Sequence, residues 1–378
     1  MSFARASYFY CVRKPGSQEK NKPSEIYYHS LLVSRIPYRE RLGGKNMGEN
    51  EHAELIRDED RDFFECELTS FVPDRVFDAH CHLWHPDHRE MDIPDVPRIA
   101  GAQEYRSLME ALCPGRRIAE LFIPWPGEKR RLANEWTAKE VRAERTSRGV
   151  FFVKSDDDPE WVRQEVRRLG LHGLKCYHVT ANVTPTWEAD IPDYLPEPLV
   201  RVADEEGWVI TLHMVKSRAV ADPKNIYWIR HYCETYPNMK LILAHSARGF
   251  QPAHNLEGLP KLTGLDNLYF DCSANCEPIA HQAILRIIGH KKLLFGTDCP
   301  VCFYRGRSLG VADTFLWLYE DTPVWGEKHM QIKPVLIGLE HLRSLKWACW
   351  SERLSDRAVE DIFWNNAADL LGVGSALE

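Results

Sequence analysis

The sequence predicts an α/β fold, a (β/α)8 TIM barrel with an N-terminal extension. From residue 75 onward, short aliphatic and β-branched runs alternate with longer amphipathic, charged segments. Most of the short runs are nearly continuously apolar, as parallel strands covered on both faces must be. Eight strand-then-helix units over roughly 300 residues are typical of this barrel. The predicted strands are RVFDAHCH, IAELFIPW, GVFFVKS, LHGLKCYHV, WVITLHMV, MKLILAHSA, NLYFDCSA and KLLFGTDCP.

Two of the intervening segments carry clear helix signals. Asp222 and Pro223 form an N-cap followed by proline in the first turn, which opens a helix that Pro237 stops after Tyr236. Residues 278–289 open with a proline and continue as an apolar-periodic run. These segments are the expected crossover helices between parallel strands.

Composition is typical of a soluble globular protein, and a cytoplasmic location is expected because no targeting signal is seen. It has 378 residues, of which 44% are hydrophobic and 27% are charged. No apolar stretch approaches the ~18 residues of a membrane span, and the start lacks the apolar core of a secretory signal. The eleven cysteines are scattered, which indicates free thiols in a reducing compartment. A redox role for the Cys299–Cys302 pair is the alternative.

The chain divides into three parts by its charge and patterning. Residues 1–46 hold nine basic and three acidic residues without a clear period, and residues 47–74 form an acidic, partly helical lead-in. The barrel domain is expected at 75–378, with loop insertions at 181–198 and 303–335. The basic residues of the extension are interrupted by Tyr, Pro and Ser, so nucleic acid is not an expected partner.

The first predicted strand ends in two histidines one residue apart. Side chains two apart in a strand point to the same face, so His80 and His82 aim at one spot. Two imidazoles converging on a point suit a metal ion. The alternative is one core histidine and one loop histidine. Asp78 is expected on the same face, supporting the site.

Other polar residues also close predicted strands, where barrel enzymes keep their chemistry. Each of these residues taken singly could be a core or supporting residue. Their joint occurrence at strand ends is harder to attribute to chance. They are Lys175 in the fourth strand, His213 and His245 at the ends of the fifth and sixth, Asp271 and Ser273 in the seventh, and Asp298 at the end of the eighth.

This order of residues resembles the amidohydrolase superfamily of metal-dependent barrels. The flanking motifs DAHCHLW, LILAHSA, LLFGTDCP and IFWNNAADLLG are most similar to its amidohydrolase-related branch, over about residues 70–375. That branch includes aminocarboxymuconate semialdehyde decarboxylase, resorcylate decarboxylases and 2-pyrone-4,6-dicarboxylate lactonase. Barrels of this branch are often dimers, so a homodimer is a candidate assembly.

The resemblance implies roles for the strand-end residues. His80, His82 and Asp298 would bind one divalent metal ion, with His213 completing the set. Zinc is the first candidate, and manganese or iron are alternatives. Asp298 would shuttle the proton of a metal-activated water, and His245 would act as general base or acid. In the binuclear alternative, a carboxylated Lys175 bridges two metals.

Several basic residues are expected to bind a small carboxylate substrate. With Lys175, the arginines that follow two predicted strand ends, Arg248, Arg305 and Arg307, would surround the metal with positive charge. Surface loops are the alternative place for these arginines. Glu277 is expected to line the site. Apolar walls are expected from Trp84, Tyr177 and Phe303, and solvated positions for His85, His88 and His254. Cys81, Cys176 and Cys272 should face the helices.

Three functions fit these residues. The main hypothesis is metal-dependent hydrolysis of a small carboxylate-bearing lactone, ester or amide by metal-activated water. The alternative is metal-dependent, non-oxidative decarboxylation of an aromatic or unsaturated acid. A catalytically inactive ligand-binding barrel is the third, although the complete ligand set argues against it. Ring-opened acid and released CO2 distinguish the first two.

Overall fold

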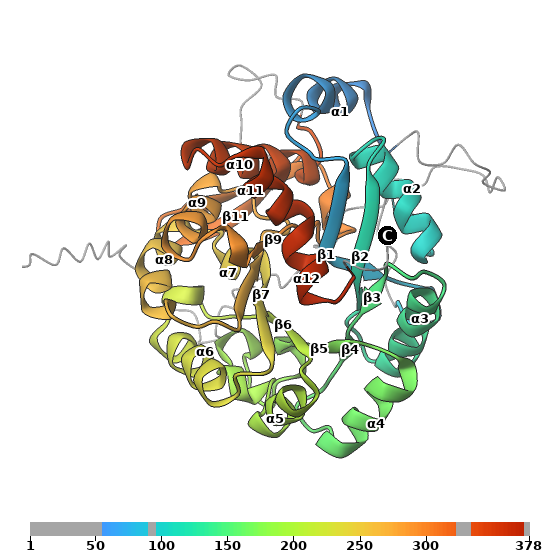
Figure 1. Ribbon diagram of the computed structural model, residues 1–378, viewed down its shortest axis with the longest axis vertical. Helices are drawn as coiled ribbons and strands as arrows, with labels where there is room; N and C mark the ends of the chain where they lie inside the picture. The colour runs from blue at the N-terminus through green and yellow to red at the C-terminus, as the bar shows by residue number, and fades with distance from the viewer. Residues whose placement is uncertain (1–54, 90–95, 323–333, 374–378) are drawn as a thin grey trace, which may run out of the picture. The chain divides into compact units, whose positions relative to one another are not determined.

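The computed structural model describes residues 55–89, 96–322 and 334–373 (Figure 1). By its internal contacts the chain divides into Met1–Met47 and Gly48–Glu378, and the described residues all belong to the second unit. The predicted basic extension, residues 1–46, therefore lies outside the described residues.

Parallel strands form the centre of the molecule, and each pairs with the next along the chain except at the junction of β3 and β4. All eight predicted runs contain strand. The strands are β1 (Arg75–Leu83), β2 (Arg117–Pro124), β3 (Arg148–Gly149), β4 (Phe151–Phe152), β5 (Gly173–Tyr177), β6 (Val209–His213), β7 (Lys240–Leu243), β8 (Leu268–Asp271) and β9 (Leu293–Leu294).

Two junctions close these strands into a barrel. The third predicted strand is divided at Val150 into β3, which pairs with β2, and β4, which pairs with β5. At the other junction, the segment after β9 bonds to β1: Ala79 N donates to Phe295 O at 2.8 Å, and Asp298 N donates to His80 O at 2.7 Å. The predicted TIM barrel is thereby confirmed.

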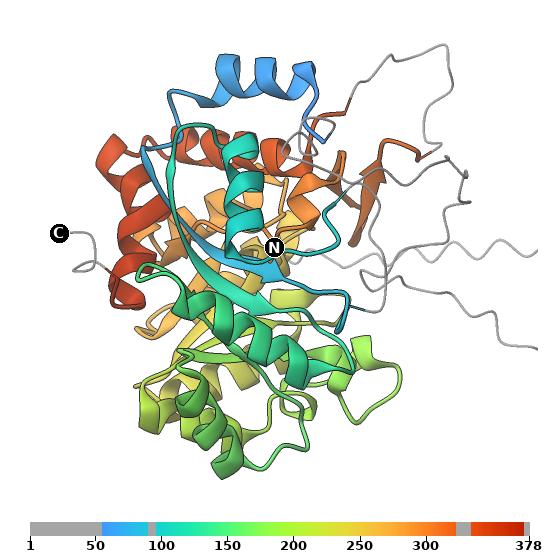
Figure 2. The same ribbon diagram turned by 90° about the vertical axis from the view of Figure 1, so that its right-hand side faces the viewer.

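Helices surround the barrel (Figures 1 and 2). Asp222 caps α6 as predicted, because its Oδ1 accepts from Lys224 N at 2.9 Å. The helices are α1 (Asp58–Phe63), α2 (Ala102–Leu112), α3 (Arg130–Arg142), α4 (Pro159–Leu169), α5 (Glu197–Glu206), α6 (Pro223–Thr235), α7 (Ala244–Arg248), α8 (Pro252–Gly258), α9 (Pro278–Ile287), α10 (Ile337–Ser351), α11 (Asp356–Glu360) and α12 (Asn366–Leu370).

The two predicted insertions hold their own short elements. Residues 181–198 contain the 3-10 turns η4 (Thr186–Glu188) and η5 (Ile191–Asp193). Residues 303–335 contain an antiparallel hairpin of β10 (Gly306–Val311) and β11 (Thr314–Tyr319). The other short turns are η3 (His178–Thr180), η6 (Ala219–Ala221), η7 (Leu259–Leu262), η8 (His290–Lys292) and η9 (Val301–Phe303).

The last helices close the N-terminal end of the barrel. A π-helical turn, η10 (Asp361–Asn365), and α12 cross that end, and Trp364 packs 6.0 Å from Phe77 inside it (Figure 1). Side chains from the strands and α12 fill this half of the interior. The polar residues that close the strands lie at the opposite end of the barrel.

The lead-in segment packs against the outside of the barrel. Helix α1 continues into the π-helical turn η2 (Phe64–Leu68), and Phe64 and Leu68 are buried. Lys346 of α10 donates to Glu67 O at 2.5 Å. Among the described residues, no helix has the length and apolar character that crossing a membrane requires.

Candidate metal centre and active site

The strand-end residues predicted from the sequence meet at the C-terminal end of the barrel. They come from β1, β5, β6 and β8 and from the segments that follow β7 and β9. All are buried: His80, His82, Lys175, His213, His245, Asp271 and Asp298. Burying so many polar groups is costly unless each has a partner or a ligand.

Three of these residues form a group that can hold a metal ion. The ligand atoms of His80, His82 and Asp298 lie within 4.8 Å of one another. Asp298 Oδ1 is 3.6 Å from His80 Nε2 and 3.4 Å from His82 Nε2. Two imidazole nitrogens and a carboxylate oxygen are suitable donors for zinc, manganese or iron.

The protonation of these groups also suits a cation. Burial and the nearby Lys175 lower the pKa of His80 to about 4, so its imidazole is neutral and has a lone pair to donate. Although burial alone would raise it, the neighbouring imidazoles of His245, His82 and His80 lower the pKa of Asp298 to about 2. The residues present therefore fit a divalent metal ion.

Asp271 fixes the orientation of His80. Its Oδ2 is 2.9 Å from His80 Nδ1, so that nitrogen carries the proton and Nε2 remains free for a metal. Asp271 Oδ1 accepts from the backbone N–H groups of His245 and Ser273, both at 3.1 Å. The strand-end position of Asp271 could be predicted from the sequence, but its role could not.

Asp78 supports the site from the opposite face of the strand. The prediction that it shares a face with His80 is wrong, because the register of β1 shifts between Asp78 and Cys81. Its carboxylate accepts from His80 N at 3.0 Å, Thr297 N at 2.9 Å and Tyr105 Oη of α2 at 2.6 Å. Burial raises its pKa to about 7.

His213 and His245 form a second imidazole pair. His213 Nδ1 lies 3.1 Å from His245 Nε2. His245 Nδ1 lies 3.1 Å from Ser273 O and 3.9 Å from Asp298 Oδ2. Burial lowers the pKa of His213 well below its ordinary value, and His245 adds to this effect. His213, the predicted fourth ligand, is thus beside His245 and outside the compact group of His80, His82 and Asp298.

His245 stands on an unusual turn. The backbone φ angles of His245, Ser246 and Ala247 are 59°, 53° and 57°, and that of Arg248 is 52°. Four successive non-glycine residues are therefore in the left-handed region. Left-handed helix costs roughly 1–2 kcal/mol per residue, so the surrounding structure must hold this turn in place.

Lys175, which is buried, and the half-buried Arg248 supply the positive charge of the site. Lys175 Nζ is 3.4 Å from His80 Nε2, and burial lowers its pKa. The Arg248 guanidinium lies over the Phe315 ring at 5.5 Å and donates to Lys216 O at 2.8 Å. Lys175 lies in β5, and Arg248 ends the turn that begins at His245.

The other predicted substrate-binding residues bond to protein groups. Arg305 donates to both carboxylate oxygens of Asp60, at 3.0 and 2.6 Å. Arg307 donates to Cys276 O at 2.9 Å, and Glu277 accepts from Gly310 N of the hairpin at 2.9 Å. Of the three predicted arginines, Arg305 and Arg307 are thus engaged by protein groups, whereas Arg248 ends the turn that begins at His245.

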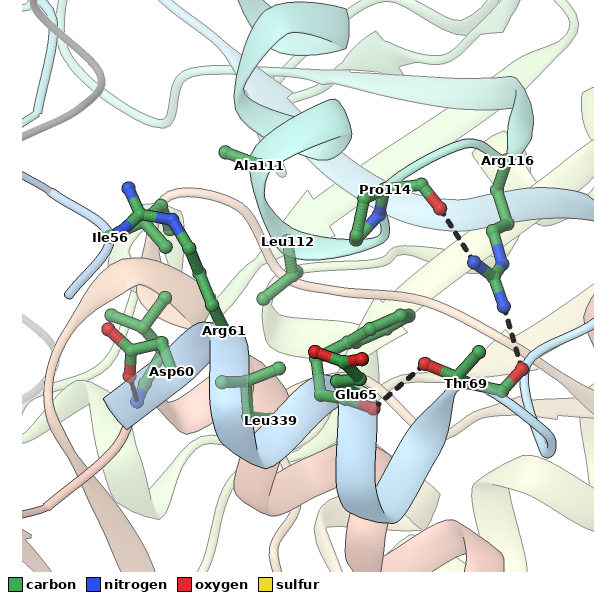
Figure 3. Close-up of a pocket in the computed structure, with 12 residues that line it drawn as sticks. Ile56, Asp60, Arg61, Glu65, Thr69, Ala111, Leu112, Pro114, Arg116 and Leu339 are labelled. Atoms are coloured by element: carbon green, nitrogen blue, oxygen red, sulfur yellow. Dashed lines mark hydrogen bonds between the residues drawn. The ribbon is translucent and has the colours of Figure 1, made fainter. Parts of the chain in front are cut away.

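Asp60 also borders a cavity of about 330 Å³ between the lead-in segment, the end of α2 and the start of α10 (Figure 3). Arg116 lies at its other end and donates to Thr69 O at 2.7 Å and to Pro114 O at 2.6 Å. None of the candidate metal ligands lines this cavity. It belongs to the junction between the lead-in segment and the barrel.

Aromatic rings stand beside three of the site histidines. Ring centroids are 6.0 Å apart for Trp125 and His82 and 4.8 Å apart for Tyr177 and His213. Phe250 lies 5.8 Å from His245 and stacks on Phe315 of the hairpin at 4.6 Å. Of the three aromatic residues predicted to line the site, Tyr177 lies beside a site histidine. Trp84 packs on Trp125, and Phe303 belongs to the outer core, the apolar cluster that strand and helix side chains form together.

Sequence reasoning missed Trp125 and Phe250. Trp125 is the last residue of the second predicted strand, so its strand-end position could have identified it. Phe250 follows the left-handed turn, and Phe315 lies in the hairpin. Neither position is marked by a signal that the sequence alone provides.

Two expectations for other histidines are wrong. His88 and His254 are buried rather than solvated. His88 Nε2 accepts from His85 N at 3.0 Å, and His254 Nε2 bonds to Asp313 at 2.9 Å. Each has a nearby loop partner, which allows an otherwise polar residue to be buried.

The cysteines face the helices, as predicted. Cys81 and Cys176 belong to the outer core, and Cys272 Sγ is 3.2 Å from His341 Nε2 of α10. Cys299 and Cys302 are buried free thiols, and burial raises the pKa of each. This environment disfavours the thiolate that a redox pair needs.

Comparison with known structures gives similar chains of low identity. The 5-carboxyvanillate decarboxylase LigW from Sphingomonas paucimobilis is 15% identical, over 79% of this chain and 99% of that chain, with a TM-score of 0.49. A 2,6-dihydroxybenzoate decarboxylase from Rhizobium is 13% identical, over 79% and 98%, with a TM-score of 0.48. An amidohydrolase from Bifidobacterium longum subsp. infantis is 15% identical, over 79% and 99%, with a TM-score of 0.48.

The sequence model of one family covers almost all of the barrel. It is described as Amidohydrolase and matches residues 77–373, which include every candidate metal ligand. No curated protein sequence matches the chain. The family match extends over more than half of the chain and agrees with the resemblance seen in the motifs. This chain therefore belongs to the Amidohydrolase family of enzymes.

Proposed function

We propose that this protein is a divalent-metal-dependent enzyme that removes the carboxyl group of a small aromatic or unsaturated acid without oxidation. His80, His82 and Asp298 would hold the ion, and His213 is the candidate for a further ligand. When bound, such an ion holds substrate oxygens and withdraws electron density from them. Zinc, manganese and iron all suit these donors.

The main support for this proposal is that an aromatic ring lies beside each of three site histidines. Trp125 lies beside His82, Phe250 beside His245, and Tyr177 beside His213. Such walls suit a flat, unsaturated molecule. Decarboxylation needs a π system of this kind, because the electron pair of the broken C–C bond must be delocalised.

The positive charges of Lys175 and Arg248 suit the acid group of that substrate. Lys175 lies against His80, and Arg248 lies over Phe315. A carboxylate entering between them gains charge-assisted hydrogen bonds in a site of low dielectric constant. The substrate is therefore a small carboxylic acid held by its acid group.

The reaction needs one proton on the carbon that loses CO2. We assign its delivery to His245, whose Nε2 is 3.1 Å from His213 Nδ1, so that one proton can be held between the two imidazoles. The C–C bond breaks, its electron pair stays on the ring carbon, and that carbon takes the proton. The products are CO2 and the compound in which a hydrogen atom replaces the carboxyl group.

Hydrolysis of a lactone, ester or amide is the second candidate. The ionised carboxylate of Asp298 is 3.4–3.6 Å from two histidine nitrogens, where it is able to accept a proton from a water molecule. Both reactions use the same ligand group. The nature of the product is what separates them.

The test is product analysis with purified protein supplied with Mn²⁺ or Zn²⁺. The protein is incubated with hydroxybenzoates, unsaturated dicarboxylic acids and lactones, and each reaction is analysed for CO2 and for new acids. CO2 release that is lost in His80→Ala and retained in the control His231→Ala supports the proposal. A ring-opened acid without CO2 supports hydrolysis, and no turnover of any acid or lactone contradicts both.

A further inference from the structure

The left-handed turn at residues 245–248 places two site residues, and neighbouring segments hold it by specific hydrogen bonds. His245 stands at its start, next to His213, and Arg248 stands at its end, over Phe315. The turn contains no glycine, so its shape is not set by its own sequence. Something outside the turn must therefore stabilise it.

Three buried side chains make these bonds, and we call them the brace: Asn255 of α8, Asn275 of the loop before α9, and His281 of α9. Asn275 Nδ2 donates to His245 O at 3.1 Å, and Asn255 Nδ2 donates to Ser246 O at 2.9 Å. His281 Nδ1 lies 2.8 Å from Ser246 Oγ. The asparagines hold the backbone, and His281 holds the only hydroxyl of the turn.

The neighbours of His281 determine the direction of that last bond. Burial lowers the pKa of His281 to about 4, so the ring is neutral and has one N–H. Its Nε2 faces Asn275 O at 2.9 Å, which is an acceptor, and therefore Nε2 carries the hydrogen. Nδ1 then accepts, and Ser246 Oγ–H donates. The imidazole ring of His281 therefore connects the turn, at Ser246, to Asn275.

We propose that His281 is a positioning residue, which fixes the left-handed turn through Ser246 and so holds His245 and Arg248 in the site. His281 contacts none of the candidate metal ligands and lies on a helix outside the barrel strands. It acts only through the turn. This inference concerns how the site is held, and it is independent of the reaction that the site performs.

Two amide substitutions of His281 each keep one of the two hydrogen bonds that its imidazole ring makes. In His281→Asn, the amide oxygen takes the place of Nδ1 and keeps the bond to Ser246. In His281→Gln, the amide nitrogen takes the place of Nε2 and keeps only the bond to Asn275 O. Ser246→Ala removes the hydroxyl with little change in volume. The matched control is His341→Phe, which replaces a buried histidine of α10 that bonds to Cys272.

The readout is hydrogen–deuterium exchange of the full-length protein as purified, followed by mass spectrometry of peptides that cover residues 244–250. A peptide from α5 serves as the internal reference. We expect exchange in the turn to rise about tenfold in Ser246→Ala and His281→Gln, because one hydrogen bond to the turn is lost. His281→Asn and His341→Phe should stay within about twofold of the unaltered protein.

Turnover gives the second readout once an acid substrate has been identified. We expect kcat to fall by about tenfold in Ser246→Ala and in His281→Gln and to be restored in His281→Asn. Equal exchange in the Asn and Gln variants, or exchange at the original rate in Ser246→Ala, would overturn the inference. Since exchange needs no substrate, that result is distinct from a failure of the proposed reaction.

Discussion

The buried ion pair between Asp60 and Arg305 connects the lead-in segment to the loop that follows the candidate metal ligand Asp298. The side chains are only 2% and 9% exposed. Asp60 Oδ1 also accepts from Leu336 N at 3.2 Å, and Oδ2 accepts from Arg57 N at 2.8 Å. In Asp60→Asn, one acceptor becomes a donor that faces existing donors, and Arg305 loses its counter-charge.

Removing one partner of a buried pair costs about 3–5 kcal/mol, because the other charge stays buried. For a domain of this size the thermal midpoint should fall by roughly 4–8 °C. The measurement is thermal unfolding followed by circular dichroism. The control, Asp58→Asn, alters a 91% exposed partner of Arg61 and should cost less than about 1 kcal/mol. Equal midpoints for the two variants would refute this reasoning.

Three further changes test other parts of the structure. Trp364→Ala opens the closed end of the barrel and should cost about 3–5 kcal/mol in urea unfolding, whereas the 75% exposed Trp350 should tolerate alanine. Because the pKa of His281 falls to about 4 on folding, its contribution to stability is complete above pH 6.5 and is lost as the pH falls towards 4. The stability difference between the unaltered protein and His281→Phe should therefore shrink by about 2 kcal/mol from pH 7 to pH 5. Lys175→Met should keep one metal ion per chain but lower turnover of the acid by about a hundredfold, and loss of the metal would indicate a bridging role.

The sequence predicted the barrel and the candidate ligands because both follow from local patterns. Parallel strands appear as apolar runs, and their ends meet on one face of the barrel. His80 and His82 could be found from their spacing alone. Asp298 could be found from its place after the last apolar run.

Features that depend on distant partners could not be predicted in this way. Arg305 follows the candidate ligand Asp298 by seven positions, but its partner Asp60 is 245 residues away. The register shift in β1 turned Asp78 to the other face. The left-handed turn after β7 has no glycine to mark it, since residues from α8 and α9 hold it.

The metal content of the protein tests the central claim most directly. The full chain is purified without chelator and without added metal, and metals are counted by plasma mass spectrometry. The account predicts one divalent ion per chain, lost in the His80→Ala, His82→Ala double variant and kept in His231→Ala. A chain without metal, or a double variant that retains its full complement, would contradict it.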